Sequence, residues 1–481
     1  MSNAGKYDLV IIGGGAAAFS AALKAESHNV KIAVVERVLL GGTCVNVGCV
    51  PSKNLLGAGE LLYSSDNPSY SSISPCYEQD FDFSRTIKQK DNLVRYLRKQ
   101  KYYDVLSSLE NVQLIEGNAS FLSANKIKVN NNSNSKTLEA KKFIVATGSS
   151  ASVPLTIKGI DNVNYITNIE TLSLDKKPSS MIVIGGRALG LEFAQMYSRF
   201  GNRVTILQRS NTIIPEYEPE VSSTLMQYLS EEGVNIITGI RIQQVYQKND
   251  TKYVRISVGN NNNNITKTLE AEELLMATGR RPNTQDLHLE NTDAKLRPSD
   301  GAIIVDSEMH TSASNIWAGG DVIGEPMLEA LAAKEGATAA DNALTGSHKK
   351  IDFLSVPSAI FTSPQVASVG LTEKRAMERY GVCDCRTLEM NDVPKALIIN
   401  ETKGLIKMVV DPNENNRIVG VHILANIAAD MIHEAVIAVK YQLTIDDIID
   451  TIHIFPTMTE AIKLAATAFK QDISKLSCCA E

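Results

Sequence analysis

The sequence predicts an α/β protein in which two βαβ units, each opened by a glycine-rich turn, precede a third domain of mixed α+β type. The first unit begins with an apolar strand at residues 7–12, and the second begins with a similar strand at Met181. After Ser355 the pattern changes to strands followed by a helix, with no further glycine turn. A length of 481 residues, at roughly 150 residues per domain, also suggests three domains.

Composition and charge exclude several classes of protein. The net charge is −6 without a basic stripe, which argues against a nucleic-acid partner. No apolar run reaches the roughly 18 residues that a membrane span needs, and no charged-then-apolar leader precedes the first strand. Seven cysteines in such a chain indicate catalytic or metal-binding thiols rather than a disulfide framework. We expect a cytoplasmic protein that acts on small molecules, away from membranes and nucleic acids.

The first unit has the features of a Rossmann-like, dinucleotide-binding fold. The three small positions of its G-x-G-x-x-G/A pattern are occupied by Gly13, Gly15 and Ala18. Small residues permit a tight turn and let backbone N–H groups approach a pyrophosphate at the N-terminus of the following helix. Glu36 ends the second strand, where a carboxylate can accept hydrogen bonds from a ribose. A plain turn would not require strand, helix and acid in this register.

The second unit departs from this pattern. Its three positions hold Gly185, Arg187 and Gly190, and the arginine would obstruct close backbone approach unless its side chain points away. Gln208 and Arg209 follow the second strand, where NAD enzymes carry an acid. An arginine can pair with a 2′-phosphate, and no carboxylate is present to repel it, which favours NADPH over NADH. The alternative is that Arg209 is a solvated surface charge.

A thiol segment, GGTCVNVGCVPSK, follows the first unit at residues 41–53, with Cys44 and Cys49 five residues apart. Near a helix N-terminus, the helix dipole lowers the pKa of a thiol and favours the reactive thiolate. A pair of inert buried thiols would not explain the whole segment. It resembles the redox-active disulfide segment of the pyridine nucleotide-disulfide oxidoreductases of class I, and the resemblance extends over essentially the whole chain.

The resemblance implies specific roles. It makes Cys49 the thiolate against the flavin, and Cys44 the interchange thiol that meets the substrate. Lys53 matches the lysine near flavin N5, with Glu192 as its ion-pair partner. FIVATGS and LLMATGRRPNT resemble the junctions between the flavin and nicotinamide domains, and IWAGGDV resembles a second flavin contact whose aspartate binds the ribityl chain. Beyond the two glycine turns, the residues assigned to cofactor binding in these segments are Gly42, Thr43, Lys53, Thr147, Gly148, Gly279 and Asp321.

The expected domains follow from these motifs. The FAD-binding domain is predicted at 1–150 and 277–352, the NADPH-binding domain at 151–276, and a dimerisation domain at 353–481. Asparagine-rich tracts at 130–134 and 260–264 are predicted to be hairpin tips.

The last domain indicates which kind of family member this is. Disulfide reductases of the family use a histidine in an H-P-T-x-x-E segment to protonate the leaving thiol, but here the segment reads FPTMTE and Phe455 takes that position. Phenylalanine cannot carry a proton. Glu460 remains as a catalytic candidate without its histidine. His453 could substitute, although we expect that no proton relay is needed.

The chain ends in KLSCCAE, where Cys478 and Cys479 are adjacent. Paired thiols on a tail suit a soft, linearly coordinated metal ion better than a structural disulfide. The tail resembles that of the mercuric ion reductases, which implies that it takes Hg(II) from small thiols and passes it to the first thiol pair of the other subunit of a homodimer. Tyr102 matches a tyrosine near the metal, and the second such tyrosine falls at Phe455. Only a catalytic core is expected, without the N-terminal metal-binding domain.

The resulting hypothesis is an NADPH-dependent FAD enzyme that reduces Hg(II) to Hg(0) in mercury detoxification, with Cys44, Cys49, Cys478 and Cys479 as metal ligands. One alternative is a dihydrolipoamide dehydrogenase-like or other disulfide reductase. Another is a metal-sequestering or redox-sensing flavoprotein without turnover. The remaining residues noted, for which a structural role is expected, are Cys76, Cys383, Cys385 and Trp317.

Overall fold

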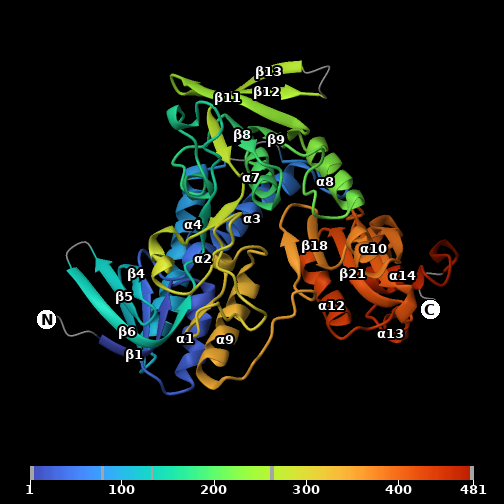
Figure 1. Ribbon diagram of the computed structural model, residues 1–481. Coiled ribbons are helices and arrows are strands. Elements are labelled where there is room, and N and C mark those ends of the chain that lie inside the picture. Colours follow the sequence, from blue (N-terminus) through green and yellow to red (C-terminus); the bar gives the residue numbers. More distant parts are fainter. Residues whose placement is uncertain (1–4, 77–80, 132–133, 260–264, 477–481) are drawn as a thin grey trace.

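The structure is a computed structural model that describes residues 5–76, 81–131, 134–259 and 265–476. Its elements form three groups (Figure 1): a sheet near the N-terminus, the second βαβ unit, and a separate sheet near the C-terminus. The long α3 (Cys49–Asp66) runs from the first group towards the second. The thiol segment therefore lies where the first two groups meet.

The N-terminal sheet follows the order β3-β2-β1-β6-β5-β4, with β16 paired to β6. Strands β1–β3 and β16 lie parallel to their neighbours, and β4–β6 form an antiparallel meander. The strands are β1 (Gly5–Ile12), β2 (Ile32–Glu36), β3 (Val112–Glu116), β4 (Asn118–Ser123), β5 (Lys126–Asn131), β6 (Asn134–Val145) and β16 (Ile316–Ala318). β16 follows the second unit in the sequence, whereas the other strands of this sheet precede it. Segments from before and after the second unit therefore form one sheet.

Two alanine-rich helices, α1 (Ala16–Glu26) and α9 (Glu329–Thr345), pack side by side on this sheet. A Cβ on Gly336 would collide with the carbonyl oxygen of Ala17, so the two helix backbones are in direct contact. The helices beside the thiol segment are α2 (Gly42–Val47), α3, α4 (Phe83–Arg98), the π-helix η1 (Lys99–Tyr103) and α5 (Asp104–Ser107).

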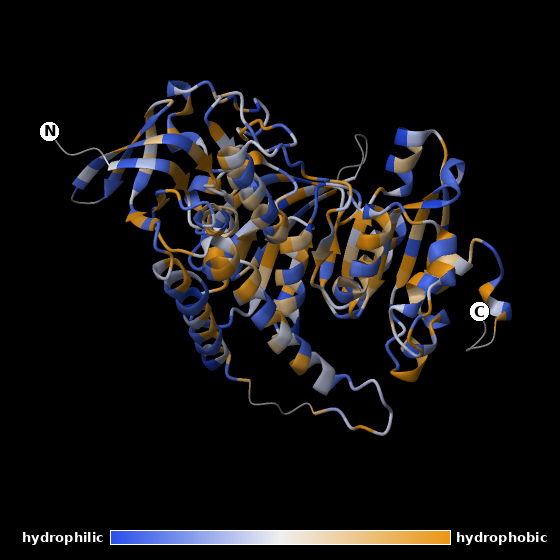
Figure 2. Cartoon of the chain, turned by 90° about the horizontal axis from the view of Figure 1, so that it is seen from below, coloured by the Kyte–Doolittle hydropathy of each residue, from blue (hydrophilic) through white to orange (hydrophobic). Residues whose placement is uncertain are grey.

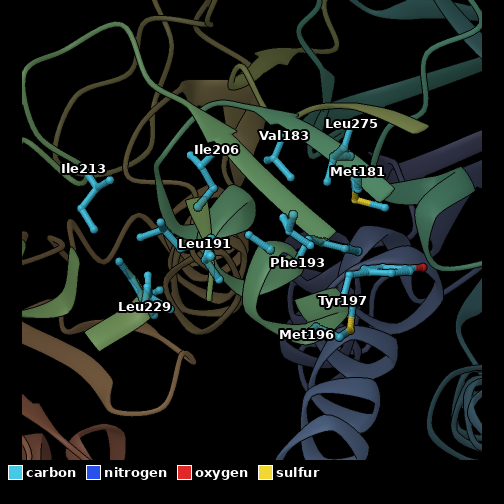
Figure 3. Packing of buried hydrophobic residues seen from close by; sticks show 14 of the residues in the cluster. Met181, Val183, Leu191, Phe193, Met196, Tyr197, Ile206, Ile213, Leu229 and Leu275 are labelled. Atoms are coloured by element: carbon cyan, nitrogen blue, oxygen red, sulfur yellow. The ribbon is translucent and has the colours of Figure 1, made fainter. Parts of the chain in front are cut away.

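The second unit has a parallel sheet with the order β10-β9-β8-β14. Its elements are α6 (Asn168–Thr171), β8 (Ser180–Ile184), α7 (Ala188–Arg199), β9 (Arg203–Leu207), α8 (Pro219–Glu231), β10 (Asn235–Ile237) and β14 (Glu273–Met276). Figure 3 shows its core, in which Leu191 and Phe193 of α7 face Val183 and Ile206 of the sheet. A second, antiparallel sheet covers the face of the parallel sheet opposite α7. It is formed by β11 (Ile240–Lys248), β12 (Thr251–Val258) and β13 (Ile265–Ala271).

The C-terminal sheet is antiparallel, with the order β17-β18-β21-β20-β19. In Figure 2 its central strands are rich in hydrophobic residues, and every residue of β20 is buried. Its elements are β17 (Ser358–Ile360), β18 (Gln365–Gly370), α10 (Glu373–Tyr380), β19 (Asp384–Glu389), α11 (Pro394–Ile398), β20 (Leu405–Asp411), β21 (Arg417–Ala425), α12 (Ala428–Lys440), α13 (Ile445–Asp450) and α14 (Glu460–Thr467).

A short antiparallel pair, β7 (Ser149–Ala151) with β15 (Arg280–Pro282), joins the first two groups. The other short helices are η2 (Ile160–Asn162), η3 (Gln285–Leu287), η4 (Leu289–Asn291), η5 (Asp321–Ile323), η6 (Met390–Asp392), η7 (Pro412–Glu414) and η8 (Ile473–Lys475). None of the helices in the described ranges combines the length and apolar character needed to cross a membrane.

The predicted fold class is confirmed: two βαβ units precede a mixed α+β domain. The strands on either side of each asparagine tract are paired antiparallel, up to Asn131 opposite Asn134 and up to Val258 opposite Ile265. Residues 132–133 and 260–264 are outside the described ranges. The domain limits stay a prediction, which the return of β16 to the first sheet supports.

Candidate active site

Two consecutive helices carry the thiol pair. Cys44 lies in α2, and Cys49 is the first residue of α3. Gly48 separates the helices, and a Cβ there would come within 2.8 Å of the carbonyl oxygen of Thr43. A side chain would thus disturb the turn, which brings the two thiols within hydrogen-bonding reach of each other.

The two thiols share their protons unequally. The Cys44 thiol donates a hydrogen bond to Cys49, and this bond together with the ammonium of Lys53 lowers the pKa of Cys49 to about 7. The same bond, with burial, holds the pKa of Cys44 well above its usual range. The N-terminal dipole of α3 adds positive potential at Cys49. At neutral pH the reduced pair therefore tends towards a thiolate at Cys49 and a thiol at Cys44.

An ion pair joins the thiol helix to the second unit. Lys53 Nζ of α3 lies 2.7 Å from Glu192 Oε2 of α7. The backbone N–H of Phe361 donates to Glu192 Oε1 at 2.9 Å, and its ring centre lies 4.5 Å from Lys53 Nζ. These partners offset the cost of burying the carboxylate. Lys53 follows Cys49 by four residues, so its charge lies on the same helix face as the thiol.

The face of α7 that carries this carboxylate continues as a polar network that the motifs do not reveal. Gln195 accepts a hydrogen bond from the N–H of Ser363 at 2.8 Å and donates one to its carbonyl oxygen at 2.7 Å. Arg199 makes hydrogen bonds of 2.9 and 3.0 Å with Glu232 and an ion pair with Glu60 of α3. Glu192, Gln195 and Arg199 are spaced i, i+3 and i+7, which places them on one helix face. This spacing of polar residues in the sequence could have indicated the network.

The first glycine turn lies against the thiol segment. A Cβ on Gly13 would collide with the carbonyl oxygen of Ala146, and one on Gly42 would come within 2.6 Å of Gly15 Cα. A Cβ on Gly15 would contact only Gly42, at 3.6 Å, so the N-terminus of α1 has room for a phosphate group. Glu36 ends β2 beside the same turn.

The two junction segments meet beside this turn. Thr147 Oγ1 donates to the carbonyl oxygen of Asn283 at 2.8 Å, and the Asn283 amide donates back to the Thr147 carbonyl oxygen at 2.9 Å. Gly148 and Gly279 have positive φ angles, of 69° and 108°, and a Cβ on either would meet no atom within 4 Å. The junction thus presents open, glycine-lined backbone.

Asp321 meets two residues of these junction strands. Ser149 Oγ donates to Asp321 Oδ2 at 2.5 Å, and Arg280 Nε donates to Ser149 Oγ at 2.7 Å while lying 3.8 Å from the carboxylate. Arg280 also reaches Thr43 Oγ1 at 3.5 Å. Behind the loop, Glu335 accepts the N–H preceding Asp321 at 2.7 Å, and burial raises its pKa to about 7. The sequence motifs gave a role to Asp321, whereas Arg280 lies within LLMATGRRPNT without an assigned role and Glu335 lies outside every motif. With the open turns, this polar set fits a bound FAD.

The second glycine turn resembles the first in its backbone. A Cβ on Gly185 would collide with the carbonyl oxygen of Ala277, and one on Gly190 with the carbonyl oxygen of Gly185. The buried Gln208 accepts a hydrogen bond from a turn N–H at 2.9 Å. Arg209 is exposed and has no ion pair with another residue of the described ranges. The second turn therefore has the same tight backbone packing as the first, and it carries an amide and an arginine in place of the acid at the ribose position.

The side chain of the arginine in this turn is held by two carboxylates. Arg187 is the N-cap residue of α7, and its guanidinium lies 3.5 Å from Glu216 and 3.8 Å from Glu325.

Tyr102 lies near the thiol pair. It belongs to η1, with its ring centre 4.7 Å from that of Phe19. Burial raises its pKa to about 12, and the charges of Cys44, Glu329 and Cys49 act in the same direction. Glu329, the first residue of α9, also raises the pKa of both thiols, and no motif marks this glutamate.

The candidate catalytic residues of the last domain do not lie near the thiol pair of the same chain. His453 Nε2 lies 2.7 Å from Glu434 Oε1, and Phe455 is 44% exposed. Glu460 Oε2 is buried without a hydrogen-bond partner in the described ranges, and burial raises the pKa of Glu460. Figure 1 shows α13 and α14 well away from α2 within one chain.

The other cysteines stand apart from this site. Cys76 is exposed, whereas Cys383 and Cys385 are half-buried beside a small apolar cluster. Of these two, only Cys385 lies within β19. Cys478 and Cys479 lie outside the described residues.

Comparison with known proteins identifies the family. Residues 7–336 match the family "pyridine nucleotide-disulphide oxidoreductase", and residues 356–466 match its dimerisation domain. Mercuric reductases from Lysinibacillus sphaericus and Streptomyces lividans are 41% and 38% identical. The alignments cover 99% and 98% of this chain, and 85% and 98% of the respective relatives.

A solved structure shows the same fold. The HOCl-induced flavoprotein disulfide reductase RclA from Escherichia coli superposes with a TM-score of 0.82 at 27% identity, covering 96% of this chain and all of that chain. The chain belongs to the pyridine nucleotide-disulphide oxidoreductase family.

Proposed function

We propose that this chain is an FAD- and NADPH-dependent enzyme that reduces Hg(II) to Hg(0). The observation that carries the proposal is the Cys44/Cys49 pair with its Lys53–Glu192 ion pair, in a chain up to 41% identical to mercuric reductases over nearly its full length. The balanced reaction takes two electrons from NADPH to the metal and releases NADP⁺, a proton and Hg(0).

The chain's own residues prepare the site for this chemistry. When bound, the flavin accepts hydride from NADPH and supplies electrons to the thiols or to the metal that they hold. Cys49 is kept as a thiolate by the Cys44 hydrogen bond and by Lys53, and Glu192 positions that lysine. Asp321 and Glu36 would hold hydroxyl groups of the flavin nucleotide. Tyr102 would lie beside a metal ion held by the thiol pair.

Soft thiolates suit the metal substrate because they hold Hg(II) strongly and still exchange it quickly. Cys44 and Cys49 form the inner pair. Cys478 and Cys479 are the outer pair, which takes Hg(II) from small thiols and delivers it to the other subunit. Two features of the sequence support the outer pair: Cys478 and Cys479 are adjacent, and the histidine that a disulfide reductase needs is replaced by Phe455.

A homodimer completes the site. The match to a dimerisation domain supports it. So does an apolar face on the last domain, where Ile437, Ile452 and Ile454 are 50–89% exposed around a groove of about 520 Å³. We place the enzyme in the cytoplasm, where thiols stay reduced.

A disulfide reductase is the main alternative, and the similarity to RclA favours considering it. Its weakness is the proton donor: His453 is hydrogen-bonded to Glu434, and Phe455 cannot protonate a leaving thiol. A redox sensor without turnover would keep the fold, but would not need the Cys49 thiolate and the Lys53–Glu192 pair together.

The deciding experiment is Hg(II)-dependent NADPH oxidation in excess small thiol, with lipoamide and glutathione disulfide in parallel. Oxidation with mercury, accompanied by volatile mercury, is the expected result. Turnover of a disulfide but not of mercury would return the chain to the disulfide reductases. Flavin that NADPH does not bleach would favour the sensor.

Replacing both Cys478 and Cys479 by alanine tests the outer pair. We expect turnover of thiol-chelated Hg(II) to fall on the order of tenfold or more, because one exchange step of the relay is lost. NADPH should still bleach the flavin. Cys76→Ala is the matched control, and unchanged mercury turnover in the double variant would remove the tail from the mechanism.

A further inference from the structure

Arg187 bridges the two nucleotide-binding units. It occupies the middle position of the second glycine turn and forms no capping hydrogen bond with its side chain. Its guanidinium pairs instead with Glu216, from the loop between β9 and α8, and with Glu325, from the loop that follows Asp321. The arginine is therefore held by carboxylates from both units.

These ion pairs are easily exchanged. Their N–O distances, 3.5 and 3.8 Å, are longer than that of the Lys53–Glu192 pair at 2.7 Å. The side chains of Arg187, Glu216 and Glu325 are 56%, 35% and 79% exposed, so water and salt screen their attraction. A better-matched anion at this turn would displace the carboxylates.

A nucleotide pyrophosphate is such an anion. It binds where a glycine turn meets a helix N-terminus, and an arginine fork can hold two phosphate oxygens at once. We propose that Arg187 leaves Glu216 and Glu325 when the nicotinamide nucleotide binds, and pairs with its pyrophosphate. The charge then replaces the close backbone contact that glycine would permit. This inference rests on the proposed use of that nucleotide.

Two arginines would then have separate tasks. Arg187 would act on the pyrophosphate, which NADP⁺ and NAD⁺ share. Arg209, exposed after β9, would act only on the 2′-phosphate of NADP⁺. Glu216 and Glu325 would weaken the binding of both nucleotides because they compete for Arg187.

The test is calorimetric titration of the FAD-loaded protein with NADP⁺ and NAD⁺, which bind without reducing the flavin. Arg187→Gln should raise both Kd values about tenfold, the usual size for a lost charged hydrogen bond. Arg209→Gln should raise only that of NADP⁺. The double variant Glu216→Gln, Glu325→Gln should lower both Kd values roughly threefold. Arg203→Gln, at the opposite end of β9, is the matched control.

Each outcome decides the question. Unchanged or tighter binding by Arg187→Gln would show that the arginine only obstructs the turn, and unchanged binding by the double glutamine variant would remove the exchange. A wild-type protein that binds neither nucleotide would overturn the inference together with the proposed cofactor. Normal nucleotide binding without mercury turnover would count against the proposed substrate alone.

Discussion

The two glycine turns have nearly the same backbone but different chemical surroundings. Gly13 and Gly185 have φ angles of 122° and 119°, and each faces the carbonyl oxygen of an alanine that follows a parallel strand. The first turn touches Gly42 of the thiol segment and has Glu36 beside it. The second carries Arg187 and has the buried amide of Gln208 in place of the acid.

The comparison indicates that the backbone sets where a nucleotide binds, whereas the flanking side chains set which nucleotide binds and how tightly. The first turn is enclosed by backbone from another segment, which suits a cofactor that stays. The second carries exposed charges with weak partners, which suits a nucleotide that enters and leaves at each turnover.

The largest effects should come from alanine at the two first glycines. Gly13→Ala and Gly185→Ala both add a Cβ against a carbonyl oxygen at a left-handed φ, at a cost of about 2 kcal/mol or more. Gly13→Ala should abolish bound flavin, measured by visible absorbance. Gly185→Ala should keep the flavin but lose its bleaching by NADPH. Loss of flavin from both variants alike would contradict the assignment of different nucleotides to the two turns.

A smaller change would make the second turn chemically like the first. Gln208→Glu places a carboxylate where Glu36 stands in the first unit, and it should repel the 2′-phosphate. We expect the Kd of NADP⁺ to rise on the order of tenfold while that of NAD⁺ changes little. Gln243→Glu adds the same charge at an exposed position of the same domain as a control. Equal effects on both nucleotides would show that the amide serves only the turn.

The smallest effect concerns the ion pair that links the two regions. Lys53→Met removes the ammonium that favours the Cys49 thiolate, so the pKa of Cys49 should rise from about 7, by roughly one unit. A lowered pKa stabilises the reduced fold at high pH, and this contribution is lost as the pH falls through 7. In Lys53→Met, the stability of the reduced protein should therefore decrease less as the pH falls through 7. Thiolate ultraviolet absorbance against pH measures the shift, and Lys88→Met, exposed on α4, should leave it unchanged.

The sequence was informative wherever a motif is local. Gly13, Gly185 and the Cys44/Cys49 segment could be placed because strand, turn and helix follow one another directly. The family resemblance linked Lys53 to Glu192, which the structure brings to 2.7 Å across 139 positions.

Other contacts could not be predicted because they depend on tertiary packing. Arg280, Ser149 and Asp321 meet only after β16 has joined the first sheet. The direction of the Arg187 side chain depends on Glu325, from a distant loop. The roles of Cys478 and Cys479 stay predictions, since these residues lie outside the described ranges.

The position of β16 also has a consequence for biosynthesis. Residues 143–145 of β6 pair with β1 on one side, and on the other side their partner in the described residues is 316–318 of β16. During translation the first sheet therefore remains incomplete until the whole second unit has emerged from the ribosome. One hydrophobic cluster lies wholly within the second unit and can form first, so the nascent chain would carry a partly folded second unit while the first sheet is still incomplete. Such an intermediate exposes an unpaired strand edge and apolar surface until β16 is synthesised. We expect chaperones to be needed at this stage.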